Sequence, residues 1–212
     1  MTDLKTNERR PDILEVISDL SNDEVFTPPA VANAMLDLLP AEVWTDPTLR
    51  WLDPGAKTGV FPREITRRLL DGLAKEIPDE DERLRHILTS MVFGIAITEL
   101  TAQISRRSVY CSKDASSQHS VVKMSTGAGN IWFNRVEHSY TNGRCRECGA
   151  SEEQMEKVNR DNHAYAFIHK TGREAVEGDM SMKFDVIVGN PPYQMTGGGG
   201  GTNDTPLYHY FV

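Results

Sequence analysis

The chain has 212 residues, 39% of them hydrophobic, and a formal net charge of −8, which favours one domain with its own core or one domain and part of another. No apolar run approaches the roughly 20 residues of a membrane span, and residues 1–10 lack the apolar core of a signal peptide, so we expect a cytoplasmic protein with no membrane partner. The acidity argues against tight autonomous binding to nucleic acid, because phosphate-binding domains are usually basic.

The first strongly patterned stretch, Val25 to Leu39, predicts a helix. Thr27 is the expected N-cap and Pro28 the expected first helical residue. The apolar face is expected to comprise Val31, Met35, Leu38 and Leu39. Taken alone, this stretch is an ordinary capped helix.

The next stretch predicts a short strand, a glycine-containing turn and a helix over about residues 61–74. The turn reads Asp53-Pro54-Gly55-Ala56-Lys57-Thr58-Gly59. The helix carries apolar side chains on one side at Ile65, Leu69, Leu70 and Leu73. A strand, a tight turn and a helix N-terminus let a cofactor approach the backbone closely.

Further elements follow at regular intervals. A helix carrying Leu84, Ile87 and Leu88 is expected to begin near Pro78 and Asp79. Residues 91–97 predict a second strand, and residues 98–110 predict a helix with a partly apolar face at Leu100, Ile104 and Val109. Residues 131–136 predict another strand.

Two of the three cysteines form a Cys-x-x-Cys pair followed by glycine, and two histidines lie further along the chain. The spacing is typical of structural zinc, whose four ligands close a tetrahedron. The expected ligands are Cys145, Cys148, His163 and His169, with His138 as an alternative and Cys111 as a remote one. A redox cysteine pair, or unrelated cysteines and surface histidines, are the competing interpretations. We interpret residues 131–172 as a zinc-binding insertion too short to pack its own core.

The last patterned stretch, Phe184 to Val188, predicts a buried strand of a parallel sheet. Asn190-Pro191-Pro192-Tyr193 ends it, because proline cannot donate to a strand ladder. The side-chain carbonyl of Asn190 and the backbone carbonyl of Pro191 can accept both N–H bonds of an exocyclic amine, and Tyr193 can stack on a planar ring. The simpler interpretation is a proline-stopped strand with a surface tyrosine.

This tetrapeptide, after its apolar strand, resembles motif IV of S-adenosylmethionine-dependent amino-methyltransferases. The closest resemblance is to the γ-class N6-adenine-specific DNA methyltransferases of restriction-modification systems. Phe26-Thr27-Pro28 is similar to motif X of that family. Residues 53–59 are similar to its motif I, usually Asp-Pro-x-x-Gly-x-Gly, with Lys57 in place of the first motif glycine. In motif II of the family an acidic residue binds ribose, and it would fall at Ala96 here. Glu99 is the nearest carboxylate; it is either the ribose ligand or a first-turn charge that favours the helix dipole.

The resemblance implies an α/β fold: a Rossmann-like methyltransferase sheet, incomplete at the C-terminus, with the small zinc-binding insertion. The expected regions are residues 1–130 with motifs X, I and II, residues 131–172 as the insertion, and residues 173–212 with motif IV and the start of a helix. Family members continue into further strands and a target-recognition domain. We therefore expect a truncated chain or one half of a split enzyme.

The implied reaction transfers a methyl group from S-adenosylmethionine to N6 of adenine in DNA. The implied catalytic residues are Asn190, Pro191, Pro192 and Tyr193. The implied cofactor-binding residues are Phe26, Thr27, Pro28, Asp53, Pro54, Gly55, Gly59 and Glu99. DNA would be bound through a missing or separate recognition domain, with an endonuclease or a second methyltransferase half as partner.

Two other functions stay open. The same tetrapeptide serves methyltransferases that act on a protein glutamine or an RNA guanine amine. A non-catalytic remnant or interaction module of the fold is favoured by Lys57, Ala96, the acidity and the absent C-terminal motifs.

Overall fold

The computed structural model describes residues 26–96, 98–134, 136–147, 149, 151–153, 163–164, 169, 183–190, 194–195 and 205–206. The helices are α2 (Pro29–Leu36), η1 (Ala41–Trp44), α3 (Val60–Gly72), α4 (Glu80–His86), η2 (Ile87–Met91) and α5 (Glu99–Tyr110). The strands are β1 (Trp51–Ala56), β2 (Val92–Ala96), β3 (Ile131–Trp132), β4 (Val136–Glu137), β5 (Tyr140–Thr141), β6 (Arg144–Cys145), β7 (His163–Ala164), β8 (Val186–Ile187), β9 (Gln194–Met195) and β10 (Thr205–Pro206). Among these described helices, none has the length and apolar character needed to cross a membrane.

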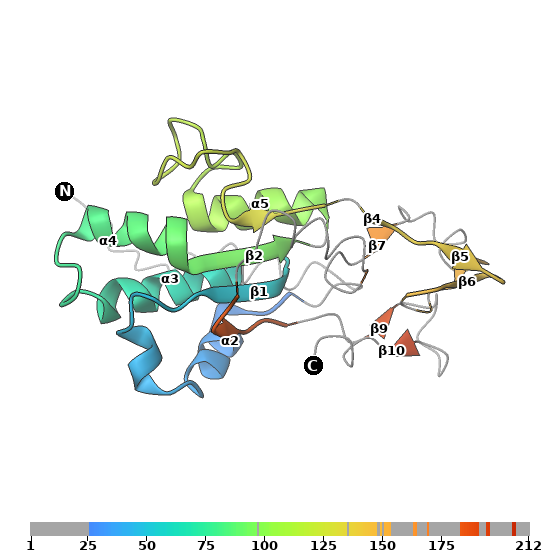
Figure 1. Cartoon of the computed structure of the whole chain (residues 1–212), viewed down its shortest axis with the longest axis horizontal. Coiled ribbons are helices and arrows are strands. Elements are labelled where there is room, and N and C mark those ends of the chain that lie inside the picture. The colour runs from blue at the N-terminus through green and yellow to red at the C-terminus, as the bar shows by residue number, and fades with distance from the viewer. Residues whose placement is uncertain are drawn as a thin grey trace, which may run out of the picture.

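Four parallel strands form the central sheet in the order β3-β2-β1-β8 (Figure 1). The chain builds from β1 through β2 to β3 and then returns to the other side of β1 with β8. This reversal makes a switch point between β1 and β8, and open α/β sheets bind ligands outside the carboxyl ends of strands at such a point. The predicted α/β class with a parallel sheet is confirmed.

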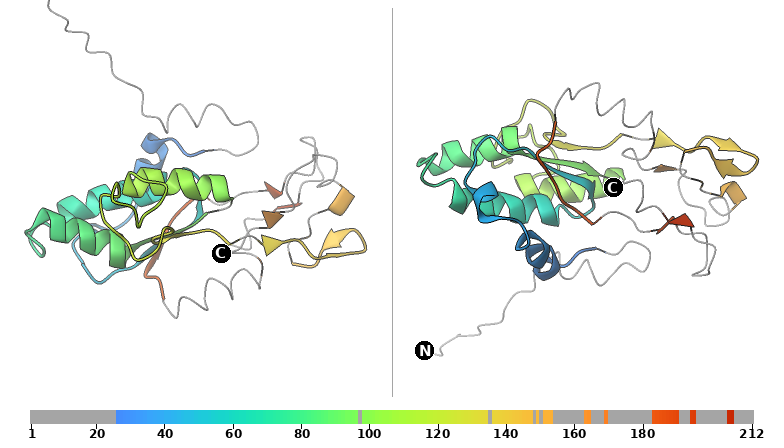
Figure 2. Two further views of the ribbon diagram at one scale, coloured as in Figure 1. Left: turned by 90° about the horizontal axis from the view of Figure 1, so that it is seen from above. Right: turned by 60° about the horizontal axis from the view of Figure 1, so that its bottom comes forward.

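One face of the sheet is covered by helices. α3 packs on β1, α5 packs on β2 and β3, and the two helices contact each other (Figure 2). The main core cluster comprises Ala32, Leu36, Trp51, Val60, Phe61, Ile65, Leu69, Leu73, Ile87, Met91 and Val92. The predicted apolar side of α3 is therefore confirmed, because Ile65, Leu69 and Leu73 all lie in this core. The opposite face carries Leu52, Phe93 and Ile95.

Three further elements, α4, β2 and α5, lie where the sequence predicts them. Asp79 caps α4 and accepts a hydrogen bond from the Glu82 amide at 2.8 Å. β2 falls within the predicted strand, and Thr98 caps α5 with a reciprocal bond to Thr101. On the predicted apolar face of α5, Val109 is buried but Leu100 is exposed.

The start of α2 differs from the prediction. Pro28, rather than Thr27, occupies the N-cap, and Pro29 rather than Pro28 is the first helical residue. No side chain caps this helix. Thr27 lies just before the helix with its side chain buried, so its hydroxyl is available for a different contact.

The buried face of α2 differs in part from the prediction. The buried residues of the helix are Ala32 and Leu36. Of the predicted apolar residues, Met35 and Leu39 pack against the core, whereas Val31 is 49% and Leu38 is 85% exposed. Asn33 donates to the buried Glu64 carboxylate at 3.0 Å, so the Asn33 side of α2 lies against α3.

β8 is shorter and less buried than the sequence predicts. It pairs with β1 over Val186 and Ile187, and Ile187 is 58% exposed. Within the described part of the chain β8 is an edge strand, so one side of it lacks the cover that a buried strand requires. The predicted parallel pairing itself is present: the Val188 amide donates to the Leu52 carbonyl at 2.9 Å.

Beyond β3, two antiparallel pairs of very short strands, β4–β7 and β5–β6, lie past the end of the sheet (Figure 1). β3 itself pairs with β2, so Ile131–Trp132 belong to the sheet rather than to the predicted insertion. The single strand predicted over residues 131–136 is thus two strands in two sheets. Asn142 and Gly143, with φ of 53° and 72°, make the tight turn between β5 and β6.

Candidate active site

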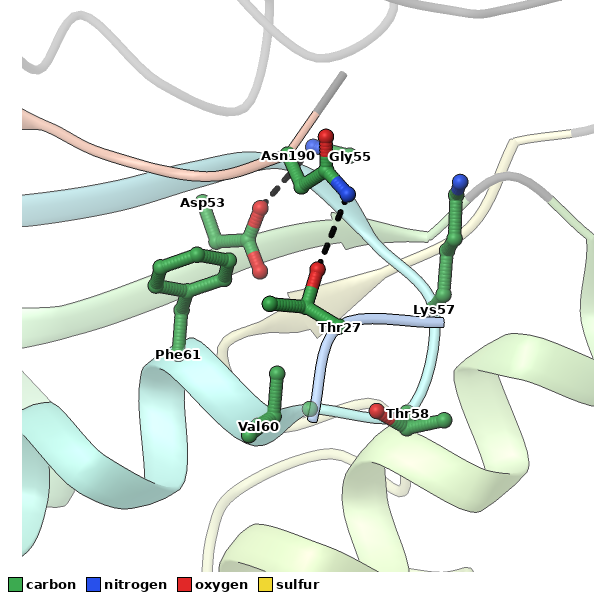
Figure 3. A pocket seen from close by; sticks show the side chains of 9 residues that line it. Thr27, Asp53, Gly55, Lys57, Thr58, Val60, Phe61 and Asn190 are labelled. Carbon is green, nitrogen blue, oxygen red and sulfur yellow. Dashed lines mark hydrogen bonds between the residues drawn. The ribbon is translucent and has the colours of Figure 1, made fainter. Parts of the chain in front are cut away.

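A pocket at the carboxyl ends of β1 and β8 gathers residues from three separated segments (Figure 3). Thr27 comes from the segment before α2, and Asn190 follows β8. The other lining residues run from β1 to the start of α3: Asp53, Gly55, Lys57, Thr58, Gly59, Val60 and Phe61. The three segments that resemble motifs X, I and IV therefore meet at the switch point of the sheet.

The turn between β1 and α3 depends on Gly59. Its φ is +73°, and a Cβ at this position would lie 2.8 Å from Cα of Ser105 in α5. Two α5 hydroxyls also fix the turn: Ser105 donates to the Lys57 carbonyl at 3.3 Å and Ser108 to the Thr58 carbonyl at 2.6 Å. The turn is therefore shaped by α5 as well as by its own glycine.

Lys57 occupies the position of the first glycine in the motif I that the sequence resembles. Its φ is not positive, since the described non-glycine residues with positive φ are Cys111 and Asn142. The backbone therefore makes no demand for glycine at residue 57. Figure 3 shows the lysine side chain extending away from Thr58 and the start of α3.

Asp53 is a buried carboxylic acid in the pocket wall. It is 2% exposed, and its Oδ1 accepts a hydrogen bond from the Gly55 amide at 3.1 Å. Burial raises the pKa of Asp53 to about 7, although the Gly55 amide and the Lys57 charge oppose the rise. Gly189 allows β8 to approach this acid, because a Cβ at residue 189 would overlap Asp53 Oδ1.

Replacement of Asp53 by asparagine is expected to change how stability depends on pH. The folded-state pKa is raised from 3.8 to about 7, so the native state holds the proton more tightly than the unfolded chain does. The stabilisation by Asp53 is therefore complete below about pH 4 and declines as the pH rises to about 7. Asp53→Asn keeps an acceptor for Gly55 but cannot ionise. As the pH rises from about 4 to about 7, the stability of Asp53→Asn relative to the wild type should increase by on the order of 4 kcal/mol.

Urea unfolding of both proteins across this pH range measures the effect. Asp46→Asn is the control, because the hydrogen bonds of Asp46 with Thr48 lower the pKa of that carboxyl, whereas burial raises the pKa of Asp53. The control should show a weak dependence of the opposite sign. A stability difference between Asp53→Asn and wild type that is constant with pH would contradict the prediction.

Asn190 presents its amide to the pocket in a fixed orientation. Its Nδ2 donates to Thr27 Oγ1 at 2.9 Å. Its Oδ1 is buried and has no hydrogen-bond partner in the part of the chain that the structure describes. A buried acceptor without a partner costs about 1–3 kcal/mol, so a ligand that brings an N–H donor to this oxygen gains from pairing it.

The other predicted site residues are placed differently. Phe26 and Pro28 flank Thr27, and Pro54 is buried within β1. Glu99 is exposed in the first turn of α5 and does not line the pocket. Pro191, Pro192 and Tyr193 lie outside the described residues.

The candidate metal ligands are partly brought together. The ligand atoms of His138, Cys145 and His169 all lie within 4.8 Å of one another, and the three residues are buried. His138, the alternative ligand in the sequence prediction, therefore belongs to this cluster. Cys148 lies outside the described residues, and for His163 the structure describes the backbone pairing of β7 with Glu137.

Several residues of the pocket were not predicted. Thr58 lies within the predicted turn, and Val60 and Phe61 directly follow it. They could have been predicted, because a ligand was expected to approach the N-terminus of the helix there. Gly189 directly precedes Asn190. Ser105 and Ser108 carry no such signal, because the carbonyls that they hold lie about 50 residues away along the chain.

The fold and the pocket define an α/β protein with a pocket at the switch point of a parallel sheet. Residues 90–212 match the Eco57I restriction-modification methylase family. An "Uncharacterized adenine-specific methylase" of Mycoplasma pneumoniae (strain ATCC 29342 / M129 / Subtype 1) is 36% identical over 234 residues, covering 99% of this chain and 56% of that protein. The chain belongs to the Eco57I restriction-modification methylase family, and it spans about half the length of the curated relative that it matches. The resemblance seen in the sequence is thereby confirmed.

Proposed function

We propose that this chain forms part of a DNA methyltransferase that transfers a methyl group from S-adenosylmethionine to N6 of adenine. The observation that carries the proposal is the buried Oδ1 of Asn190, which has no hydrogen-bond partner among the described residues and which Thr27 orients after β8. Membership of a restriction-modification methylase family and the adenine-specific relative support the same substrate.

The pocket suits the proposed cofactor, which supplies a methyl group activated by a positively charged sulfur. Asp53 is a buried acid that can balance a positive charge on a ligand. Gly55 and Gly59 line the pocket at the turn, and Phe61 adds an apolar side chain. We propose that these residues and Thr27 hold S-adenosylmethionine. From the resemblance we retain Phe26, Pro28 and Pro54 as neighbours of the site and Glu99 as the ribose ligand.

The proposed substrate group is an exocyclic amine with two N–H donors. Asn190 Oδ1 accepts one of them, and the Pro191 carbonyl is proposed to accept the other. Both acceptors raise electron density on the nitrogen as it becomes tetrahedral. Pro192 stiffens this turn and Tyr193 stacks on the base, which must first be flipped out of the duplex. Catalysis on this scheme is mostly positioning and requires no general base.

We further propose that DNA is bound mainly by a region or partner other than residues 1–212. The chain carries 31 acidic and 23 basic residues, and a net charge of −8 is unsuited to binding a phosphate backbone tightly. A separate recognition domain, a second methyltransferase half or an endonuclease would supply the contacts. In this arrangement the regions around β1 and β8 provide the chemistry, and the segment between β3 and β8 is an insertion.

Calorimetric titration of the purified chain with S-adenosylmethionine tests the proposal. Micromolar binding is expected for the wild type. Asn190→Ala is the matched variant, since it removes the proposed substrate contact and should bind the cofactor as the wild type does. A folded chain with no detectable binding would contradict the cofactor assignment and would favour a non-catalytic interaction module.

A further inference from the structure

We infer that His138, Cys145 and His169 form a structural zinc site that holds the insertion together. Among the described residues from 133 to 169, the buried ones are Val136, His138, Cys145 and His169. Three of these four carry side chains that bind metals. A described centre made of two imidazoles and a thiol offers little apolar area, so a bound metal would supply the stability that a small core cannot.

The spacing of the three side chains suits a tetrahedral ion. Their ligand atoms lie within 4.8 Å of one another, and Cys145 Sγ is 3.9 Å from His169 Nε2. With Zn–S near 2.3 Å and Zn–N near 2.0 Å, neighbouring ligand atoms of a tetrahedron are about 3.3–3.6 Å apart. The His138 and His169 rings meet edge to face at 5.1 Å, which avoids stacking and lets both present a nitrogen to one point.

A hydrogen bond and a glycine with positive φ shape the backbone that follows Cys145. The Gly149 amide donates to the Cys145 carbonyl at 3.0 Å, and the φ of Gly149 is +74°. The bond brings the backbone of Gly149 back to that of Cys145. Cys148 lies outside the described residues, and we assign the fourth ligand position to it from the Cys-x-x-Cys spacing alone.

The ligands come from three points that would otherwise be weakly joined. His138 follows β4, Cys145 ends β6 and His169 comes after β7. Each of these strands has two residues, so ladder hydrogen bonds contribute little to holding the pairs β4–β7 and β5–β6 together. One ion would cross-link both pairs. Four protein ligands would leave no open position, which makes the ion structural rather than catalytic.

Metal analysis of the purified chain tests this inference independently of methyl transfer. We expect one zinc ion per chain. After exchange with cobalt, we expect a thiolate-to-metal charge-transfer band and the intense visible bands of tetrahedral cobalt. Cys145→Ser should abolish the charge-transfer contribution of that thiolate and lower metal content. Cys111→Ser is the matched control, since Cys111 is an exposed cysteine outside the cluster.

Histidine variants test the ligand set. His138→Ala and His169→Ala should lower zinc content, whereas His119→Ala, at an exposed histidine, should not. Full metal content in His138→Ala together with loss in His163→Ala would overturn the assignment of His138. Full metal content in a folded Cys145→Ser variant would overturn the site itself.

Chelation of the wild-type chain gives a readout that needs no variant. Arg144 and Arg146 are exposed on the β5–β6 hairpin and next to Cys145. Removal of zinc should speed tryptic cleavage after these residues, and added zinc should restore protection. A wild-type chain that keeps no metal after gel filtration with equimolar zinc, and whose cleavage is insensitive to chelators, would overturn the inference.

Discussion

Asn190→Ala is expected to lower the rate of methyl transfer by about 10²- to 10³-fold while leaving the affinity for S-adenosylmethionine within about threefold. The substitution removes the buried acceptor that is proposed to bind the amine, and it lies on the substrate side of the pocket. Transfer of labelled methyl groups to adenine-containing DNA, in the active assembly that contains this chain, measures the rate. Calorimetry on the same preparations measures the cofactor affinity.

Thr27 provides the matched test of how Asn190 is positioned. Thr27→Val keeps the side-chain shape but removes the hydroxyl that accepts the Asn190 Nδ2 hydrogen at 2.9 Å. At saturating S-adenosylmethionine we expect a loss of about tenfold in the transfer rate, which corresponds to one hydrogen bond. Thr27→Ser should restore the rate. Equal rates for Thr27→Val and wild type would show that this contact does not orient the amide.

Gly59→Ala is expected to destabilise the fold by about 2–5 kcal/mol. A left-handed backbone costs an alanine about 1–2 kcal/mol. The new Cβ would also lie 2.8 Å from Ser105 Cα, and such overpacking typically adds about 1–3 kcal/mol. Because the Ser105 contact is with backbone, the clash cannot be relieved by a side-chain rotation. Urea unfolding monitored by tryptophan fluorescence measures the loss.

Gly143→Ala is the matched control for this effect. Gly143 has φ +72°, nearly the same as Gly59, but nothing lies within 4 Å of the position a Cβ would take. Gly143→Ala should lower stability only through its left-handed backbone conformation, by about 1–2 kcal/mol at most. If the two alanine variants are equally stable, the close packing of α5 on the turn is not what makes Gly59 necessary.

The elements of the sheet were predictable because their signals are local. The apolar side of α3 and the caps of α4 and α5 follow from residue spacing within one or two turns. The side of α2 that faces α3 was not fully predictable, since the bond from Asn33 to Glu64 joins two different helices. The exposure of Ile187 was not predictable either, because an edge strand and a central strand can share one apolar pattern.

The candidate site was predictable as segments but not as contacts. The patterns around residues 27, 53–59 and 190 led to three motifs, and the structure brings all three into one pocket. The bond from Asn190 to Thr27 spans most of the chain, and no spacing rule reaches so far. His138 precedes the cysteine pair and falls outside the usual sequence template for zinc, so the sequence indicated it only as an alternative ligand. The Asn142-Gly143 turn, by contrast, was a local hairpin signal that the sequence analysis left unused.

The hydroxyls of Ser105 and Ser108 have a consequence for building chimeras between related methylases. They hold the Lys57 and Thr58 carbonyls from a helix that begins 40 residues after the turn ends. A graft of residues 53–59 alone would therefore transfer the sequence of the turn but not its conformation. A crossover point placed between α3 and α5 would separate the turn from its supports, whereas one placed after α5 would keep them together. Residues 53–110 are the smallest block that should be exchanged as a unit.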